Sequence, residues 1–181
     1  MKLLDKIKNA AGKKIIKRRQ DKMVCEMLKH PDPRLSTENL LVDMSPKTRQ
    51  SRVDLLQKLN ATLNAQTWGG KLGIAAPQIG INLRACIVLG TPMFNPIFTA
   101  PKHGAETEMI EGCYSLPKSD VYLVKRAKYG WVKWYDVDGN FHDERVTDMK
   151  AIVAQHEISH LDGKCCNELG TLIERKIPQK L

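Results

Sequence analysis

The segment QHEISH at residues 155–160 holds the residue types in this chain that are best suited to chemistry. Two histidines four residues apart on a helix project from the same face, so His156 and His160 can bind one metal ion. Glu157 lies between them and can act as a base towards a metal-bound water. The pattern HExxH also occurs by chance, where its histidines are ordinary surface residues. This segment alone therefore leaves a metal site and a chance match both open.

A hydrolytic metal site needs a further ligand. Such sites usually have three protein ligands and one position open for water. In common proteases with HExxH the third ligand is a distant Glu, or a His six residues after the second histidine. That position is Cys166 here, so the longer pattern is absent. Cys113 is a candidate, because Gly112 lets the backbone approach closely and a metal would deprotonate the thiol. A free cysteine is more often a small buried apolar residue, so both interpretations stay open.

The two histidines need a rigid helix to hold them. Thr147 and Asp148 are good N-caps, and Gly163 is a good stop, so we expect a helix from Thr147 or Asp148 to Leu161. A second helix is expected over residues 45–63, with a serine as N-cap followed by a proline at the first helical position.

Strands are expected in the sequence between these two helices. Residues 84–89 form a strand-like run, and Asn95-Pro96-Ile97 ends another short extended piece, while the polar residues 99–109 predict a loop. Asp138-Gly139 predicts a hairpin between residues 129–137 and 140–146. We therefore expect an α+β fold, with antiparallel or mixed β-sheets around a central helix that carries HExxH.

The positive charge is concentrated at the start of the chain. Residues 1–24 contain nine Lys/Arg and two Asp, and so carry +7 of the net charge of +9. Apolar residues recur there at helical spacing, which predicts a basic amphipathic helix. An anionic partner such as ribosomal RNA, a membrane surface or an acidic protein would suit it. A helix packed on the domain is the alternative, and an organelle-targeting segment is disfavoured by only two arginines and no serine. We expect a 1–24 extension and a 25–181 catalytic domain.

The bulk composition is that of a globular protein. The chain has 181 residues, 42% of them hydrophobic and 27% charged, which suits a single domain with a real core. No apolar run reaches the roughly 20 residues that span a bilayer, and no secretory signal is recognisable. Five cysteines with irregular spacing fit a reducing compartment, so we expect a cytoplasmic location.

Three segments resemble the signature motifs of the peptide deformylase family. They are GIAAPQIG at 73–80, EGCYSLP at 111–117 and QHEISHLDG at 155–163, and the resemblance covers roughly residues 28–165. It implies removal of the formyl group from the N-terminal formyl-methionine of nascent polypeptides, with release of formate. It also implies one divalent metal ion, natively often ferrous iron, in a site that Zn²⁺ or Ni²⁺ can occupy.

The resemblance also assigns roles to residues. It implies that Cys113, His156 and His160 hold the metal and that Glu157 passes the water proton to the leaving amine. Gly73 and Gln78 match the first motif, and the resemblance implies that Gln78 and the backbone N–H of Tyr114 stabilise the oxyanion. The substrate pocket is expected to contain Leu72, Met109, Glu111, Ile152 and Val153.

Four positions depart from the family pattern. Lys71 stands where a glycine is usual, Tyr114 where leucine is usual, and Ser159 where aspartate is frequent. An arginine often found shortly after the second motif has no clear match, since Ser119-Asp120 lie there. No ligand is lost, so we expect an active enzyme with altered substrate preference.

Two other functions are weighed against this one. A small zincin protease would use HExxH but would have no need of Cys113. A non-enzymatic scaffold that binds RNA or the ribosome would have no use for Glu157 as a base. The expected partners are a formyl-Met nascent peptide and, through residues 1–24, the ribosome. We expect a monomer without a membrane span, in a bacterial or phage-infected cytoplasm rather than in an organelle.

Overall fold

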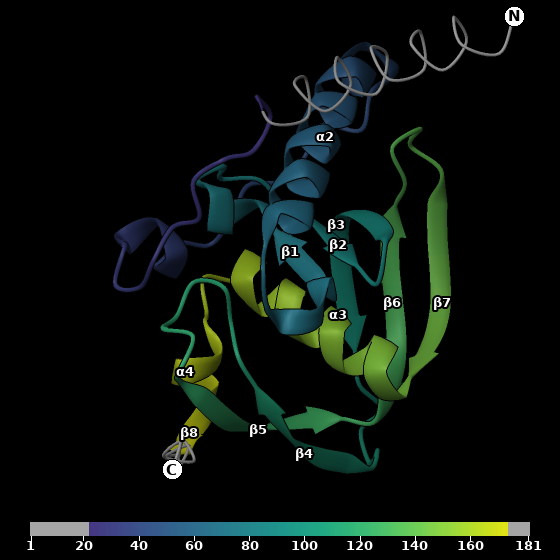
Figure 1. Cartoon of the computed structure of the whole chain (residues 1–181). Coiled ribbons are helices and arrows are strands. Elements are labelled where there is room, and N and C mark those ends of the chain that lie inside the picture. The colour runs from purple at the N-terminus through teal and green to yellow at the C-terminus, as the bar shows by residue number, and fades with distance from the viewer. Residues whose placement is uncertain (1–21, 174–181) are drawn as a thin grey trace, which may run out of the picture.

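Two antiparallel sheets lie on either side of helix α3 (Asp148–Leu161) in the computed structural model, which describes residues 22–173 (Figure 1). The larger sheet has five strands in the order β1-β2-β3-β6-β7, and the smaller has three in the order β4-β5-β8. The α+β prediction is thus confirmed, with all the sheet pairings antiparallel. The basic helix expected within residues 1–24 falls almost wholly outside the described residues.

The larger sheet consists of β1 (Gly73–Ala75), β2 (Ala85–Val88), β3 (Thr91–Thr99), β6 (Tyr129–Tyr135) and β7 (Phe141–Thr147). The predicted hairpin is present, since Tyr135 pairs with Phe141 across the turn that contains Gly139. The expectation that a strand ends at Asn95-Pro96-Ile97 is wrong, because β3 continues to Thr99. A register shift between Phe94 and Ile97 absorbs the proline, and Asn95 has a positive φ of 51° there.

The smaller sheet consists of β4 (Glu106–Glu111), β5 (Val121–Ala127) and β8 (Gly170–Ile173). The loop predicted over residues 99–109 is therefore only partly present, because β4 begins at Glu106. Exposed and more buried residues alternate along β4, so Glu106, Glu108 and Ile110 face solvent while Thr107, Met109 and Glu111 face inwards. A polar sequence at the edge of a sheet can still form a strand.

Helices cover both faces of the larger sheet. On one face, α2 (Arg49–Ala65) packs Leu55, Leu59 and Leu63 against a cluster that includes Ile87 and Phe94. On the other face, α3 packs against alternate residues of the same strands. That second cluster includes Val88, Met93, Val132, Ala151, Ala154, Ile158 and Leu161. The alternation of side chains along the strands thus places α3 in the interior, between the two sheets.

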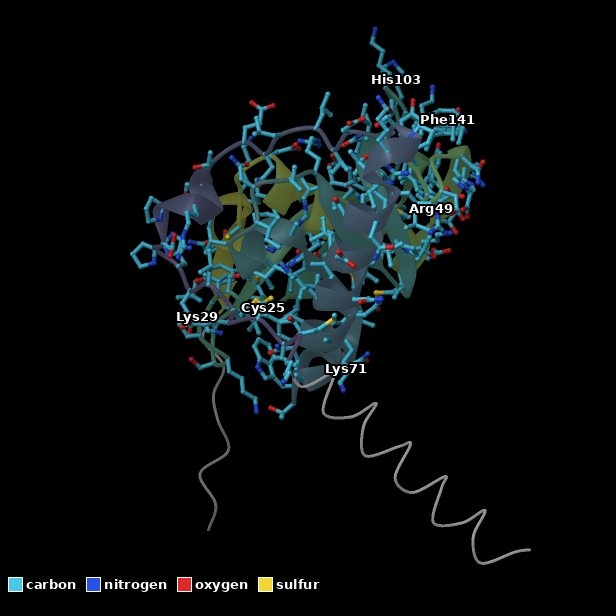
Figure 2. The ribbon with its side chains drawn as sticks, turned by 90° about the horizontal axis from the view of Figure 1, so that it is seen from above. Cys25, Lys29, Arg49, Lys71, His103 and Phe141 are labelled. Carbon is cyan, nitrogen blue, oxygen red and sulfur yellow. The ribbon has the colours of Figure 1, made fainter. Side chains whose placement is uncertain are left out.

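Short 3-10 helices and one short α-helix complete the part of the chain that the structure describes. They are η1 (Pro33–Ser36), η2 (Pro46–Thr48), η3 (Gly69–Lys71), η4 (Ala76–Ile79) and α4 (Cys166–Leu169). The helix predicted over 45–63 begins as η2 and becomes α-helical only at Arg49, and neither Ser45 nor Thr147 caps its helix through its side chain. Figure 2 shows Arg49 at the end of the molecule where Phe141 also lies, with Lys71 at the opposite end. Among the described residues, no helix is long and apolar enough to cross a bilayer.

Candidate metal centre

Three predicted ligands lie together in the interior. The ligand atoms of Cys113, His156 and His160 are within 4.8 Å of one another, and Cys113 Sγ is 3.2 Å from His160 Nε2. Both histidines project from α3, whereas Cys113 follows β4 of the smaller sheet. One thiolate and two imidazoles form a donor set that suits a zinc or iron ion. The helix and the smaller sheet thus each contribute to one candidate metal site.

A buried ion pair orients His156. Its Nδ1 lies 2.8 Å from Glu111 Oε2, so its Nε2 is left for the site. Arg126 donates to both oxygens of Glu111, at 2.8 and 2.9 Å, and also to Ser159 Oγ at 3.1 Å. Burial would raise the pKa of Glu111, but Arg126 and His156 lower it to about 2. Glu111 is therefore a carboxylate with both oxygens already bound.

Sequence analysis did not identify Arg126 as a residue of the site. Arg126 on β5 binds Glu111 across the β4–β5 pair, whereas Ser119 and Asp120 occupy the positions directly after the second motif, as the sequence analysis noted. A usable signal was present: an arginine on the inward face of an alternating strand requires a buried acidic partner. Ser159, which replaces an aspartate, still accepts a hydrogen bond from Arg126.

The Cys113 sulfur is surrounded by donors. Gln78 Nε2 and the Ser115 backbone N–H each lie 3.4 Å from Sγ. Burial would raise the pKa of Cys113, but the nearby His160 and His156 lower it well below its ordinary value. Gln78 is itself fixed, because its Oε1 accepts from the Ala75 N–H at 2.9 Å. The amide of Gln78 is therefore held with its NH₂ group directed at the thiolate.

Glu157 is buried beside the predicted metal ligands. Its Oε2 has no hydrogen-bond partner among the described residues, which leaves an acceptor ready for a water molecule. Burial raises the pKa of Glu157 to about 7, although charge on His156 and His160 acts against the rise. Gly73 lies against it: a Cβ on Gly73 would be 2.4 Å from Glu157 Oε1. The space for the Glu157 side chain therefore depends on a glycine at position 73.

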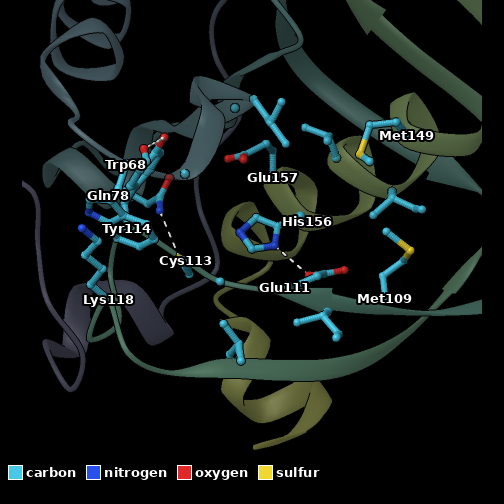
Figure 3. A pocket seen from close by; sticks show the side chains of 18 residues that line it. Trp68, Gln78, Met109, Glu111, Cys113, Tyr114, Lys118, Met149, His156 and Glu157 are labelled. Carbon is cyan, nitrogen blue, oxygen red and sulfur yellow. Dashed lines mark hydrogen bonds and ion pairs between the residues drawn. The ribbon is translucent and has the colours of Figure 1, made fainter. Parts of the chain in front are cut away.

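A cavity of about 430 Å³ opens onto this cluster (Figure 3). All five predicted substrate-pocket residues line it, as do Gly73, Gln78, Tyr114, Glu157 and two of the three predicted ligands. His160, the third, is buried and does not line the cavity. Sequence analysis did not identify Trp68, Met149, Lys118 and Val121, which also line the cavity. They lie outside the three motifs or at their edges, so only the tertiary fold brings them here.

Comparison with known proteins gives a consistent match. The family model described as polypeptide deformylase matches residues 24–171. A peptide deformylase from Zymomonas mobilis is 32% identical over 150 residues, which cover 76% of this chain and 80% of that protein. A crystal structure of the class I type b peptide deformylase from Acinetobacter baumannii superposes with a TM-score of 0.72 at 27% identity, covering 80% of this chain and 98% of that one. A probable peptide deformylase from Synechococcus phage S-SSM7 gives a TM-score of 0.72 at 26% identity, covering 80% and 99%.

Proposed function

The chain belongs to the polypeptide deformylase family, and from this membership we propose how its own residues carry out the reaction. A peptide deformylase is a hydrolase that removes the formyl group from the N-terminal methionine of nascent polypeptides and releases formate. The match accounts for all three motifs together, whereas a zincin protease would account for HExxH alone.

We propose that Cys113, His156 and His160 hold one divalent metal ion. The ion would lower the pKa of a bound water and polarise the formyl group. Ferrous iron is proposed as the native metal, with Zn²⁺ or Ni²⁺ able to take its place, because a Cys/His/His donor set accepts all three. Glu111 and Arg126 would keep the Nε2 of His156 directed at the ion.

Glu157 is proposed as the general base and then the general acid. It would take a proton from the attacking water and deliver it to the nitrogen of the leaving methionine. The observation that carries this role is the buried, unpartnered Oε2 beside the three ligand atoms. A pKa of about 7 suits a group that must accept and release a proton near neutrality.

Gln78 and the Tyr114 backbone N–H are proposed to stabilise the charge that forms on the formyl oxygen. Preorganised hydrogen-bond donors directed at a developing charge are usually the largest single contribution to stabilisation of the transition state. The hydrogen bond from the Ala75 N–H supports the proposal for Gln78, because it fixes the orientation of the amide before substrate binds.

The methionine side chain is proposed to occupy the apolar part of the cavity. Leu72, Met109, Ile152 and Val153 line it there, and the Met109 thioether adds a flexible, polarisable surface. For Glu111, which also lines the cavity, we propose a positioning role towards His156, since both of its oxygens are bound to protein.

We further propose that the catalytic unit comprises residues 25–181 and acts as a monomer on formyl-Met nascent peptides. Residues 1–24 are proposed to contact the ribosome through their positive charge. Bacterial and phage relatives support a cytoplasmic setting in a bacterium or a phage-infected host. Unchanged ribosome co-sedimentation after deletion of residues 1–24 would count against the ribosome contact.

Formate release from a formyl-Met peptide tests the function. Protein purified without oxygen and loaded with Fe²⁺ or Ni²⁺ should release formate, while Cys113→Ala and Glu157→Ala should not. Glu144→Gln is a suitable control, because Glu144 lies on β7 and pairs with Lys150 away from the cavity. Metal binding at one ion per chain without formate release from wild type would reject the proposal.

A further inference from the structure

The Tyr114 hydroxyl joins two separate walls of the cavity. It donates to the Trp68 carbonyl at 2.9 Å and accepts from the Lys71 N–H at 3.1 Å. Tyr114 directly follows the ligand Cys113, whereas Trp68 and Lys71 belong to the loop before β1. Two of the departures from the family pattern, Lys71 and Tyr114, thus make one hydrogen bond with each other.

The loop is built around this ring. A Cβ on Gly69 would lie 2.8 Å from Tyr114 Cε1, so the tyrosine fits only because position 69 is a glycine with a φ of 77°. Lys71 keeps a positive φ of 55°, and its Nζ donates to the Asn64 carbonyl at 2.6 Å. Hydrogen bonds of Lys71 therefore attach the end of the loop to α2 and to Tyr114, and the Trp68 carbonyl attaches the start of the loop to Tyr114.

The result is an aromatic wall, formed by Trp68 and Tyr114. Their ring centroids are 5.0 Å apart at an interplanar angle of 71°, an edge-to-face arrangement. In Figure 3 this wall lies on one side of Cys113 and His156, and Met109 and Met149 lie on the other side. The cavity thus has apolar side chains at both ends with the proposed metal ligands between them, and Lys118 lines it beside Tyr114.

We propose that the aromatic wall is a specificity-determining surface for the residue that follows formyl-methionine, and that it favours a large apolar or aromatic side chain. The inference rests on the proposed function. In this arrangement the methionine side chain lies at the Met109 end and the formyl group lies at the proposed metal ligands. The residue that follows methionine must then lie against a different wall of the cavity, and the aromatic wall is available for it. Aromatic faces bind apolar and aromatic side chains at low entropic cost.

Rates on formyl-Met-Xaa-Ser peptides test the proposal, with phenylalanine, leucine or serine as the second residue. Wild type should show a kcat/KM about tenfold higher for phenylalanine or leucine than for serine, as expected when one wall covers an apolar side chain. Trp68→Ala should bring that ratio close to one. Tyr114→Phe, which keeps the ring but frees the loop, should lower the ratio up to about fivefold.

Two control variants are matched to these. Trp131→Ala removes an exposed tryptophan of β6, and Tyr129→Phe removes a hydroxyl from the same strand; neither residue lines the cavity. Both should keep the wild-type ratio. Equal rates on all peptides in wild type, or an unchanged ratio in Trp68→Ala, would overturn the proposal. Absence of formate with every peptide would instead reject the proposed function itself.

Discussion

Gly73→Ala adds a single methyl group at the point where β1 meets α3. The new Cβ would lie 2.4 Å from Oε1, 2.7 Å from Cδ and 2.8 Å from Cγ of Glu157. The φ of Gly73 is not in the left-handed region, so the backbone accepts alanine and the strain arises from Glu157 alone. β1 cannot yield easily, because it pairs with β2 and its side chains are fully buried.

The Glu157 carboxylate must therefore move by about 1 Å to restore ordinary contact. A displacement of about 1 Å costs on the order of 100-fold in rate for a group that must be placed for proton transfer. We expect kcat to fall by about 100-fold, which corresponds to about 2.7 kcal/mol. The overpacking should also lower the free energy of unfolding by about 1–3 kcal/mol. The three atoms nearest the new methyl group all belong to Glu157 and none to a proposed ligand, so metal content should stay near one ion per chain.

The assay is formate release under steady-state conditions with metal-loaded protein, alongside metal analysis. Gly112→Ala is the matched control, since its Cβ would meet Trp68 Cζ3 at an ordinary 3.7 Å, and it should lose far less activity. A Gly73→Ala enzyme with wild-type kcat would refute the reasoning. So would a loss that tracks a loss of metal, because the clash would then act on the ligands rather than on Glu157.

Three further outcomes follow from buried or hydrogen-bonded charges. Arg126→Met leaves Glu111 buried without its cation, and urea unfolding should show a loss of about 3–5 kcal/mol together with weaker metal retention. Arg52→Met removes a fully buried guanidinium that donates to three carbonyls and a hydroxyl, and should cost about 2–4 kcal/mol in the same assay. Burial alone would raise the pKa of Asp136, but hydrogen bonds from Asn140 and other hairpin groups lower it below its ordinary value. Its contribution to stability is thus present above about pH 4 and lost as the pH falls, so Asp136→Asn should flatten the acid limb of a stability–pH curve.

Local patterns predicted the helix that carries the two proposed histidine ligands and the hairpin beside it. The α3 helix ends at Leu161 as expected, because its stop signal, Gly163, follows within two residues and adopts a φ of 72°. The β6–β7 hairpin was equally accessible, since Asp138-Gly139 determines the turn without help from the rest of the fold. The i, i+4 spacing of the two histidines needed only the helix.

What could not be predicted depends on contacts between distant segments. β4 has a polar sequence, and only pairing with β5 makes it a strand. The bond from Arg126 to Glu111 requires the register of that pair. Trp68 belongs to none of the three motifs. Its position at the cavity depends on the hydrogen bond from Tyr114, which lies more than forty residues further along the chain. Composition and periodicity carry no information about such pairings.

The two glycines against large side chains bear on how this sequence can be recombined with its relatives. Gly69 is required by the Tyr114 ring and Gly73 by the Glu157 carboxylate, so each is one half of a long-range pair rather than part of a self-contained motif. A chimera that imports the 68–73 segment alone would place a foreign loop against a resident tyrosine. Exchange of residues 68–73 together with 113–116 keeps both partners of the first pair, and the second pair is kept only if residues 155–160 are exchanged as well.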